Sequence, residues 1–442
     1  MRDNLMNEMN SKYEGRYLKR TNKSREITER AKKYMPGGDT RASIFFQPYP
    51  FWIGKANGCR INDIDGNEYI DFHNCYTALV HGHANPAVLT ALREQMINGT
   101  AHGALVPIVV RWAEILCERL KSVERIRFVN SGTEAVMMAI RAARGFTGKD
   151  KIIKTEYGYH GSYDPVVHPS NAKGLPKSSE VESITIPFND RHAAERAVKD
   201  NKDQLAALIV ESLMGSAGFV TPEDGYLNFL REITIKNNLL FILDEVQSFR
   251  LDYGGMQKIA AISPDITVLG KLIGGGLPVG AFGGRLDIMN QFSPSELKIY
   301  HGGTLNANPM TASAGVATLE QLTTKEIAKI NALGEMLAGG FRKVFSKYNI
   351  KGQVTGYGSL QNIHFSNTPI VNGKNAAEAN KEILRPLHFA LMERGIFYAG
   401  RGTFSVSTPT SEKEIEIAIK AMDDAMGELV PYAEELWPDL LG

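Results

Sequence analysis

Cysteine is scarce in this 442-residue sequence, and neither sign of charge is in marked excess. Cys59, Cys75 and Cys117 are scattered and odd in number, which argues against a disulfide framework and indicates a reducing compartment. The formal net charge is +1, so the charge balance points to neither nucleic acid nor a membrane surface as a partner. No apolar run approaches the roughly 18 residues that a membrane span requires, and a signal-peptide core is missing. We therefore expect a cytoplasmic protein.

The composition is that of an ordinary globular chain, with 43% hydrophobic and 22% charged residues. Helical and strand patterns alternate from about residue 86 to 325, which is typical of a doubly wound, mostly parallel α/β sheet. The flanking segments, 1–85 and 326–442, are expected to form a second, smaller α+β domain.

Local signals predict several individual elements. A helix is expected over Ser24–Met35, ending at Pro36, and Asp65-Gly66-Asn67 predicts the turn of a hairpin. A further helix is expected over Met310–Leu322. The C-terminal part predicts strands at 350–354, 360–365 and 405–407, and helices near 382–394 and from 412.

Lys271 stands at the end of a predicted buried strand, after the apolar run 265–270 and before the glycines of 274–276. Burial favours the neutral amine, which is the nucleophilic form of lysine. Such a lysine suits a Schiff base with pyridoxal phosphate. By itself the pattern is weak, because most lysines at strand ends are solvated.

Two other predicted strands end in polar groups. The strand 239–243 leads into Asp244, and the strand 125–129 leads into Ser131-Gly132-Thr133 at the start of a helix. Strand carboxyl ends line the ligand crevice of an open α/β sheet, so these groups can converge with Lys271. Hydroxyls and N–H groups at a helix N-terminus can hold a phosphate, and an acid can pair with the pyridine nitrogen. The simpler alternatives are an ordinary helix cap and a turn acid.

Other motifs are weaker indications of a binding site. Tyr159 could stack on a flat ring, although buried tyrosines more often belong to the core. His81 and His83 lack a third ligand at suitable spacing, so we expect no metal. Leu272 follows Lys271 where a P-loop needs Ser or Thr, and Gly274–Gly276 lacks the spacing of a dinucleotide fingerprint.

Five motifs together resemble those of class III pyridoxal-phosphate aminotransferases, in order and in spacing. The resemblance is strongest to glutamate-1-semialdehyde aminomutases and β-amino-acid (β-phenylalanine) aminotransferases, and it extends from about Ala31 to the C-terminal helix. The motifs are Asn130–Ala135, Tyr159-His160-Gly161, Asp244–Gln247, Gly270–Pro278 and His301–Thr304.

The resemblance implies fold type I, with a seven-stranded large-domain sheet and the active site at a homodimer interface to which the N-terminal segment adds an arm. Lys271 would form the Schiff base, and Asp244 would pair with the pyridine nitrogen. Val246 would pack on one face of the ring and Tyr159 on the other. Glu211, at the end of another strand, would also contact the cofactor.

The remaining cofactor contacts implied by the resemblance concern the phosphate and the phenolic oxygen. Ser131, Gly132 and Thr133 would hold the phosphate, with Thr304 reaching it from the partner subunit. Gln247 would lie near the phenolic oxygen.

The sequence departs from the aminomutase pattern at three places. The segment Asp244–Arg250 is one residue shorter, as in β-phenylalanine-type aminotransferases. Ser216 stands where the aminomutases have an asparagine near the cofactor, and Gly37–Arg41 replaces a different early motif. These departures argue against aminomutase activity and leave the cofactor chemistry unchanged.

Arg41 and Arg401 are candidates for binding a substrate carboxylate. Guanidinium binds carboxylate in a two-pronged fashion, and glycines beside Arg401 leave room for a ligand to approach. The alternative is that both are ordinary surface arginines.

Together these observations predict a homodimeric, ping-pong aminotransferase that moves an amino group from an amino acid to a 2-keto acid. The favoured donor is a β-amino acid or an aryl amino acid. The alternatives are a glutamate-1-semialdehyde 2,1-aminomutase-like isomerase, an amino-acid racemase on the same fold, and a non-catalytic binding protein.

Overall fold

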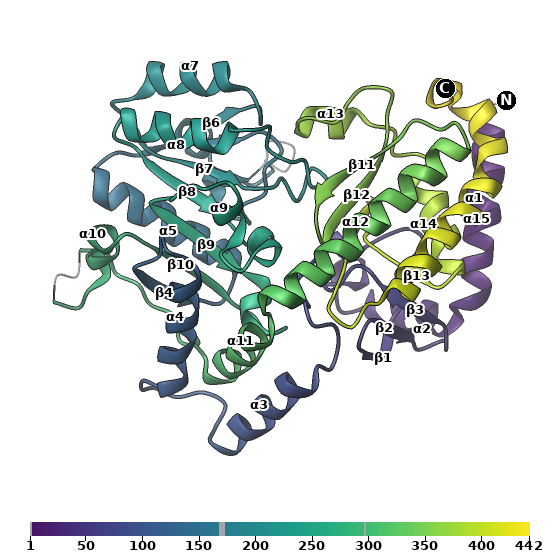
Figure 1. The fold of residues 1–442 in the computed structure, drawn as a ribbon. Coiled ribbons are helices and arrows are strands. Elements are labelled where there is room, and N and C mark those ends of the chain that lie inside the picture. The colour runs from purple at the N-terminus through teal and green to yellow at the C-terminus, as the bar shows by residue number, and fades with distance from the viewer. Residues whose placement is uncertain (1, 168–172, 296–297) are drawn as a thin grey trace.

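The chain folds into two lobes that lie side by side, as the computed structural model shows for residues 2–167, 173–295 and 298–442 (Figure 1). The larger lobe is built around one sheet, and the smaller lobe contains both chain ends. Within these described ranges, no helix is long and apolar enough to cross a membrane.

The large lobe contains a seven-stranded sheet in the order β4-β10-β9-β8-β7-β5-β6. Only β10 is antiparallel to its neighbours, so the prediction of a mostly parallel seven-stranded sheet is confirmed. The strands are β4 (Arg125–Val129), β5 (Lys151–Thr155), β6 (Ser183–Ile186), β7 (Leu205–Glu211), β8 (Leu240–Asp244), β9 (Ile266–Gly270) and β10 (Gly280–Gly284).

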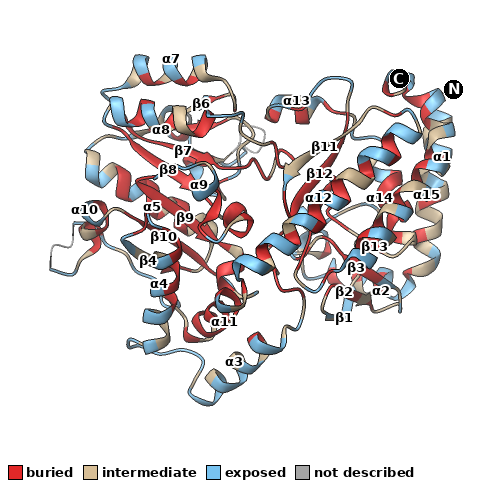
Figure 2. Cartoon of the chain, viewed as in Figure 1, coloured by how far each residue is buried: buried red, intermediate tan, exposed pale blue. Residues whose placement is uncertain are grey.

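Helices cover both faces of this sheet, and the alternating side chains of the strands explain how. Ile209 and Ile242 point to the face covered by α5 (Gly132–Thr147), whereas Leu208 and Phe241 point to the opposite face. The central strands β7, β8 and β9 are buried along their whole length, as Figure 2 shows in red. This is the expected environment of parallel strands covered on both sides. The other helices of this part of the chain are α3 (Pro86–Ile97), α4 (Pro107–Arg119), α6 (Ser178–Glu182), α7 (Arg191–Asn201), α8 (Tyr226–Lys236), α9 (Gly255–Ile259), α10 (Leu286–Met289) and α11 (Pro309–Gln321).

The small lobe joins segments from the two ends of the chain. Its two sheets have the orders β1-β2-β3-β13 and β11-β12-β14, and β13 pairs in parallel with β3. The strands are β1 (Ile53–Asn57), β2 (Arg60–Asp63), β3 (Glu68–Asp71), β11 (Gly352–Tyr357), β12 (Leu360–Phe365), β13 (Ile396–Phe397) and β14 (Thr403–Ser405). The helices are α1 (Arg2–Arg20), α2 (Asn22–Ala31), α12 (Thr324–Lys347), α13 (Gly373–Glu378), α14 (Leu384–Glu393) and α15 (Glu412–Leu436).

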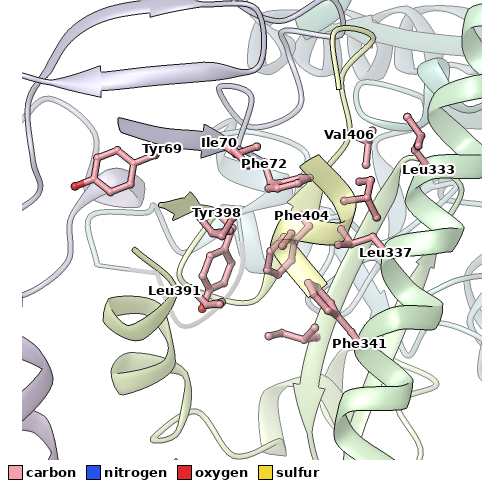
Figure 3. Packing of buried hydrophobic residues seen from close by; sticks show 14 of the residues in the cluster. Tyr69, Ile70, Phe72, Leu333, Leu337, Phe341, Leu391, Tyr398, Phe404 and Val406 are labelled. Atoms are coloured by element: carbon pink, nitrogen blue, oxygen red, sulfur yellow. The ribbon is translucent and has the colours of Figure 1, made fainter. Parts of the chain in front are cut away.

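An aromatic and aliphatic core holds these small-lobe elements together. Tyr398 and Phe404 are stacked with ring centroids 4.4 Å apart, and Phe341 of α12 packs edge-on against Phe404 (Figure 3). Residues of β3, including Ile70 and Phe72 just beyond it, belong to the same buried cluster. Segments more than 300 residues apart in the sequence therefore share one core.

Several local predictions agree with the structure. The hairpin at Gly66 joins β2 and β3, and the helix expected over Met310–Leu322 is α11. The predicted C-terminal strands and helices correspond to β11, β12, β14, α14 and α15. The helix expected over Ser24–Met35 is found over Asn22–Ala31, and α1 was not anticipated. The division of the chain at residues 85 and 325 remains a prediction.

Asp265 anchors the edge of the sheet at which β8 and β9 begin. Its buried carboxylate accepts hydrogen bonds from Arg231, from Arg285 and from the backbone N–H of Phe241. The two arginines extend from α8 and from the end of β10, so one carboxylate ties four elements together. This edge is opposite the strand carboxyl ends, where a ligand crevice is expected.

We expect Asp265→Asn to lower the free energy of unfolding by roughly 3 kcal/mol, because two guanidinium groups lose a buried anionic partner. The loss should appear in urea denaturation followed by circular dichroism. Turnover by the folded variant should equal that of the unaltered protein. A variant of normal stability would show that this ion-pair cluster is not a structural anchor.

Candidate active site

A cavity of about 390 Å³ opens at the carboxyl ends of the central strands. Its volume lies in the range typical of small-molecule sites. Polar groups at the ends of β4, β7, β8 and β9 line it, and the sequence pattern predicts three of these strand ends, those of β4, β8 and β9. Of the predicted site residues, those that line the cavity are Ser131, Gly132, Thr133, Tyr159, Glu211, Asp244, Val246, Gln247 and Lys271.

The N-terminus of α5 forms one end of the cavity. Ser131 caps this 16-residue helix, with its Oγ accepting a hydrogen bond from the backbone N–H of Glu134. Among the described residues, the backbone N–H groups of Gly132 and Thr133 have no acceptor. Free N–H groups and the positive end of the helix dipole together favour a phosphate.

Asp244 ends β8, and both of its carboxylate oxygens are fixed by the protein. Oδ1 accepts a hydrogen bond from the backbone N–H of Val246 at 3.0 Å. Oδ2 lies 2.8 Å from Nδ1 of the buried His160. Since a carboxylate only accepts, Nδ1 of His160 carries the hydrogen of this bond. The carboxyl group is thus held in one orientation at the wall of the cavity.

Lys271 follows β9 directly, with a left-handed backbone φ of 51° that points the chain into a short 3-10 helix. Burial lowers the pKa of its amine, while the nearby carboxyl groups of Asp244 and Glu211 raise it and Arg401 lowers it. The net direction is downward, which increases the fraction of the nucleophilic neutral amine.

Val246 and Tyr159 line the same cavity and provide two surfaces for a flat ring. Val246 is held close to the backbone of Gly132 and of Gly270, where an added Cβ would contact its methyl groups. The side chain of Tyr159 is more than half exposed, and its backbone N–H donates to Glu211.

Glu211 is a buried carboxyl at the end of β7. It accepts hydrogen bonds from the backbone N–H groups of Tyr159 and Gly215, at 2.9 and 3.0 Å. The pKa of Glu211 is raised to about 7, chiefly by burial; His160 lowers it and the neighbouring Asp244 raises it. This carboxyl therefore changes charge near neutral pH.

Gln247 and Ser216 differ in whether their side chains reach the cavity. Gln247 lines the cavity, and its amide fills the space that a side chain at Gly215 would need. Ser216 does not line the cavity, because its hydroxyl donates to the carbonyl of Tyr157 at 2.7 Å.

Thr304 lies outside the main cavity of its own chain. It lines a second hollow of about 160 Å³ at the surface, beside the exposed side chains of Leu105, Val110 and Leu305. Within one chain, Thr304 is therefore not combined with the residues around Lys271.

Arg401 lies in the turn between β13 and β14, close enough to Lys271 that its charge lowers the pKa of that amine. Its Nε is 3.4 Å from Oγ1 of Thr403, and no carboxylate among the described residues pairs with its two terminal nitrogens. The side chain is open to solvent, yet the surrounding protein is dense enough that desolvation lowers its pKa. Arg41 is exposed on a neighbouring segment and, like Arg401, does not line the main cavity.

Sequence reasoning missed three residues of this region. His160 was noticed only within a motif, and its bond to Asp244 joins residues 84 positions apart. Cys75 lines the cavity, and Tyr76 lies against Arg401. No local pattern marks either of the last two residues as part of a site.

The donor set fits pyridoxal phosphate. The N-terminus of α5 would hold the phosphate, Val246 and Tyr159 would lie against the ring, and Asp244 and a lysine of lowered pKa line the same cavity. Among the described residues, no group of His, Cys, Asp and Glu could hold a metal ion.

Comparison with known proteins agrees with this geometry. Residues 46–426 match the family model described as aminotransferase class-III. A glutamate-1-semialdehyde 2,1-aminomutase of Methanocaldococcus jannaschii is 42% identical over 417 residues, which cover 91% of this chain and 97% of that one.

Solved structures of the same kind superpose closely. An omega-transaminase from Sphaerobacter thermophilus is 39% identical with a TM-score of 0.89, covering 91% of this chain and 97% of that chain. A β-phenylalanine aminotransferase from Variovorax paradoxus is 32% identical with a TM-score of 0.91, covering 96% and 98% respectively. This chain belongs to the class III aminotransferase family and is an enzyme whose cofactor is pyridoxal phosphate.

Proposed function

We propose that this enzyme is an aminotransferase that moves the amino group of a carboxylated amine, a β-amino acid or an aryl amino acid, to a 2-keto acid. The observation that carries the carboxylated substrate is the guanidinium of Arg401, which acts on Lys271 and pairs with no carboxylate among the described residues. A guanidinium without a protein carboxylate is suited to a carboxylate of the substrate. The two half-reactions would share one site, which gives ping-pong kinetics.

The structural relatives support amino transfer. Two of them are named as an omega-transaminase and a β-phenylalanine aminotransferase. Ser216, with its hydroxyl bonded to the backbone of Tyr157, offers no amide to the cofactor where the aminomutases have asparagine. The shorter segment Asp244–Arg250 is a second difference from those enzymes.

A second candidate is the glutamate-1-semialdehyde 2,1-aminomutase reaction. Several proteins similar to this chain bear this name, at identities of 38–42%. Their names favour this isomerase over the aminotransferase. Both reactions use an amino compound with a carboxylate, so the assignment of Arg401 serves either one.

Lys271 would perform the proton transfers at the substrate carbon. When bound, pyridoxal phosphate supplies an aldehyde carbon that captures the amine and a ring that withdraws electrons from it. Because its pKa is lowered, the amine of Lys271 can take a proton from the substrate carbon that bears the amino group. It would then return that proton to the carbon on the other side of the same nitrogen.

Asp244 would hold a proton on the pyridine nitrogen, and His160 would keep its carboxylate in position. Val246 and Tyr159 would exclude water from the two ring faces. Ser131, Gly132 and Thr133 would bind the phosphate, and Gln247 and Glu211 would lie toward the phenolic oxygen.

We also propose a homodimer in which Thr304 completes the phosphate site of the other subunit. Its surface hollow is flanked by strongly exposed apolar side chains, which a second copy of the chain would cover. The exposed residues are Leu105, Val110 and Leu305.

The two candidate reactions are separated by the fate of the amino group. We expect 3-amino-3-phenylpropanoate and 2-oxoglutarate to yield glutamate, with kcat/KM at least about tenfold above that for glutamate-1-semialdehyde alone. Chromatography of the amino compounds measures both reactions. Isomerisation of glutamate-1-semialdehyde without loss of amino groups, together with no glutamate from the first pair, would replace the aminotransferase by the aminomutase.

Glu211→Gln should shift the pH dependence of cofactor capture to lower pH. Below about pH 7 the Glu211 carboxyl is neutral, and above it the charge raises the pKa of Lys271 and so reduces the share of the neutral amine. Without that charge, the neutral amine is present at lower pH. The rate at which the cofactor-free protein binds pyridoxal phosphate, followed by absorbance, measures the shift. Superimposable profiles above pH 7 would contradict this role of Glu211.

A further inference from the structure

A strained turn follows β3 and leads into the active site. Four consecutive residues, Asn74, Cys75, Tyr76 and Thr77, have positive φ angles of 46°, 50°, 53° and 73°. None is glycine, and side chains make this left-handed conformation costly. Such strain persists only where the surroundings fix it, and it is concentrated at functional sites.

The beginning of the turn is fixed by Asp71. Its Oδ1 accepts hydrogen bonds from the backbone N–H groups of His73 and Asn74, at 2.7 and 3.0 Å. Its Oδ2 lies 2.7 Å from Nε2 of His83. The side-chain amide of Asn74 also donates to the carbonyl of Ser405.

The end of the turn is fixed by Arg250, the last residue of the segment Asp244–Arg250, whose side chain is fully buried. Its guanidinium donates to the carbonyl of Thr77 at 3.2 Å, to the hydroxyl of Ser359 and to the carbonyl of Val406. The turn is therefore tied to both lobes at once.

This arrangement places Tyr76 between the segments that carry the two arginines. Its hydroxyl donates to the carbonyl of Ser43, two residues after Arg41. Its ring lies under the guanidinium of Arg401, 5.8 Å from the centroid to Cζ. The ring also packs edge-on against His73, whose ring centroid is 4.1 Å away.

The charges of Arg401 and Arg41 both act on His73, the neighbour of Tyr76. Burial lowers the pKa of His73 to about 4; Asp71 raises it, and Arg401 and Arg41 both lower it. His73 is therefore neutral beside Tyr76. Nε of Arg401 faces Thr403 and Cζ lies over the ring of Tyr76, while the terminal nitrogens have no carboxylate partner among the described residues and so remain available for a ligand.

We propose that Tyr76 is a positioning residue for substrate carboxylate recognition: its ring orients Arg401 and its hydroxyl holds the Arg41 segment. This inference rests on the proposed function, in which Arg401 binds the carboxylate of the substrate. Holding both groups in place before binding reduces the ordering cost that the substrate would otherwise bear.

The test compares 3-amino-3-phenylpropanoate with 1-phenylethylamine, which has the same ring and amine without the carboxylate. The measured quantity is the ratio of their kcat/KM values, with 2-oxoglutarate as acceptor. Tyr76→Phe loses the bond to Ser43 and should lower the ratio roughly threefold to tenfold. Tyr76→Leu also loses the ring face and should lower it roughly fivefold to thirtyfold. Tyr432→Phe, on the outer helix α15, is the matched control.

A binding measurement accompanies the kinetics. Calorimetric titration of the holoenzyme with 3-phenylpropanoate, which has the carboxylate but no amine, should show weaker binding in the order wild type, Tyr76→Phe, Tyr76→Leu. Thermal melting checks that the variants are folded. Tyr76→Phe retains the shape of the residue and keeps the test valid if the leucine variant unfolds.

Arg401→Ala distinguishes failure of this inference from failure of the proposed function. If Arg401→Ala lowers the ratio and both Tyr76 variants leave it unchanged, the inference about Tyr76 is overturned and carboxylate recognition stands. If Arg401→Ala leaves the ratio unchanged, recognition by Arg401 is wrong and the inference fails with it. Equal losses toward both donors in the Tyr76 variants would indicate a merely structural residue.

Discussion

Burial of the Lys271 amine at the end of β9 is the constraint on which the rest of the site depends. A buried amine loses its proton more readily, and the carboxyl groups of Asp244 and Glu211 limit how far that shift goes. Lys271 itself is only partly exposed, at the wall of the cavity, and the chain on either side of it is closely packed. A side chain at Gly275 would collide with the carbonyl of Ala314 in α11, and one at Gly315 would collide with the carbonyl of Ile273. Gly275 and Gly315 thus allow α11 to pack closely against the segment that follows Lys271.

The groups that stabilise the sheet and the groups that line the active site lie at opposite edges of the sheet. At the edge where β8 and β9 begin, Asp265 joins two arginines in a cluster that has no access to the cavity. At the opposite edge the groups are less well satisfied: His160 keeps a buried Nε2 without a partner among the described residues, and Arg401 lacks a carboxylate. The left-handed turn 74–77 adds strain of about 1–2 kcal/mol per residue there. Unsatisfied and strained groups are thus gathered where a cofactor and a substrate bind.

Much of this site is visible in the sequence because its residues stand at the ends of apolar strands. Lys271, Asp244 and Ser131 each follow such a run, and the topology of a parallel sheet brings strand ends together. The sheet itself was predicted for the same reason, since buried parallel strands leave continuous apolar runs. Features that depend on contacts between distant parts of the chain could not be predicted from the sequence. Tyr76 gains its place only through partners at Ser43 and Arg401, and α1 is stabilised by packing against the C-terminal helices rather than by a strong pattern of its own.

The most direct test of this account is the behaviour of Lys271→Ala. If the buried amine both captures the cofactor and moves protons, the variant should lose the absorbance band of lysine-bound pyridoxal phosphate and nearly all turnover. It should still fold, and it should still bind the cofactor through the N-terminus of α5. Turnover within about tenfold of the unaltered enzyme would contradict the account, because loss of a group that is both nucleophile and base should cost far more.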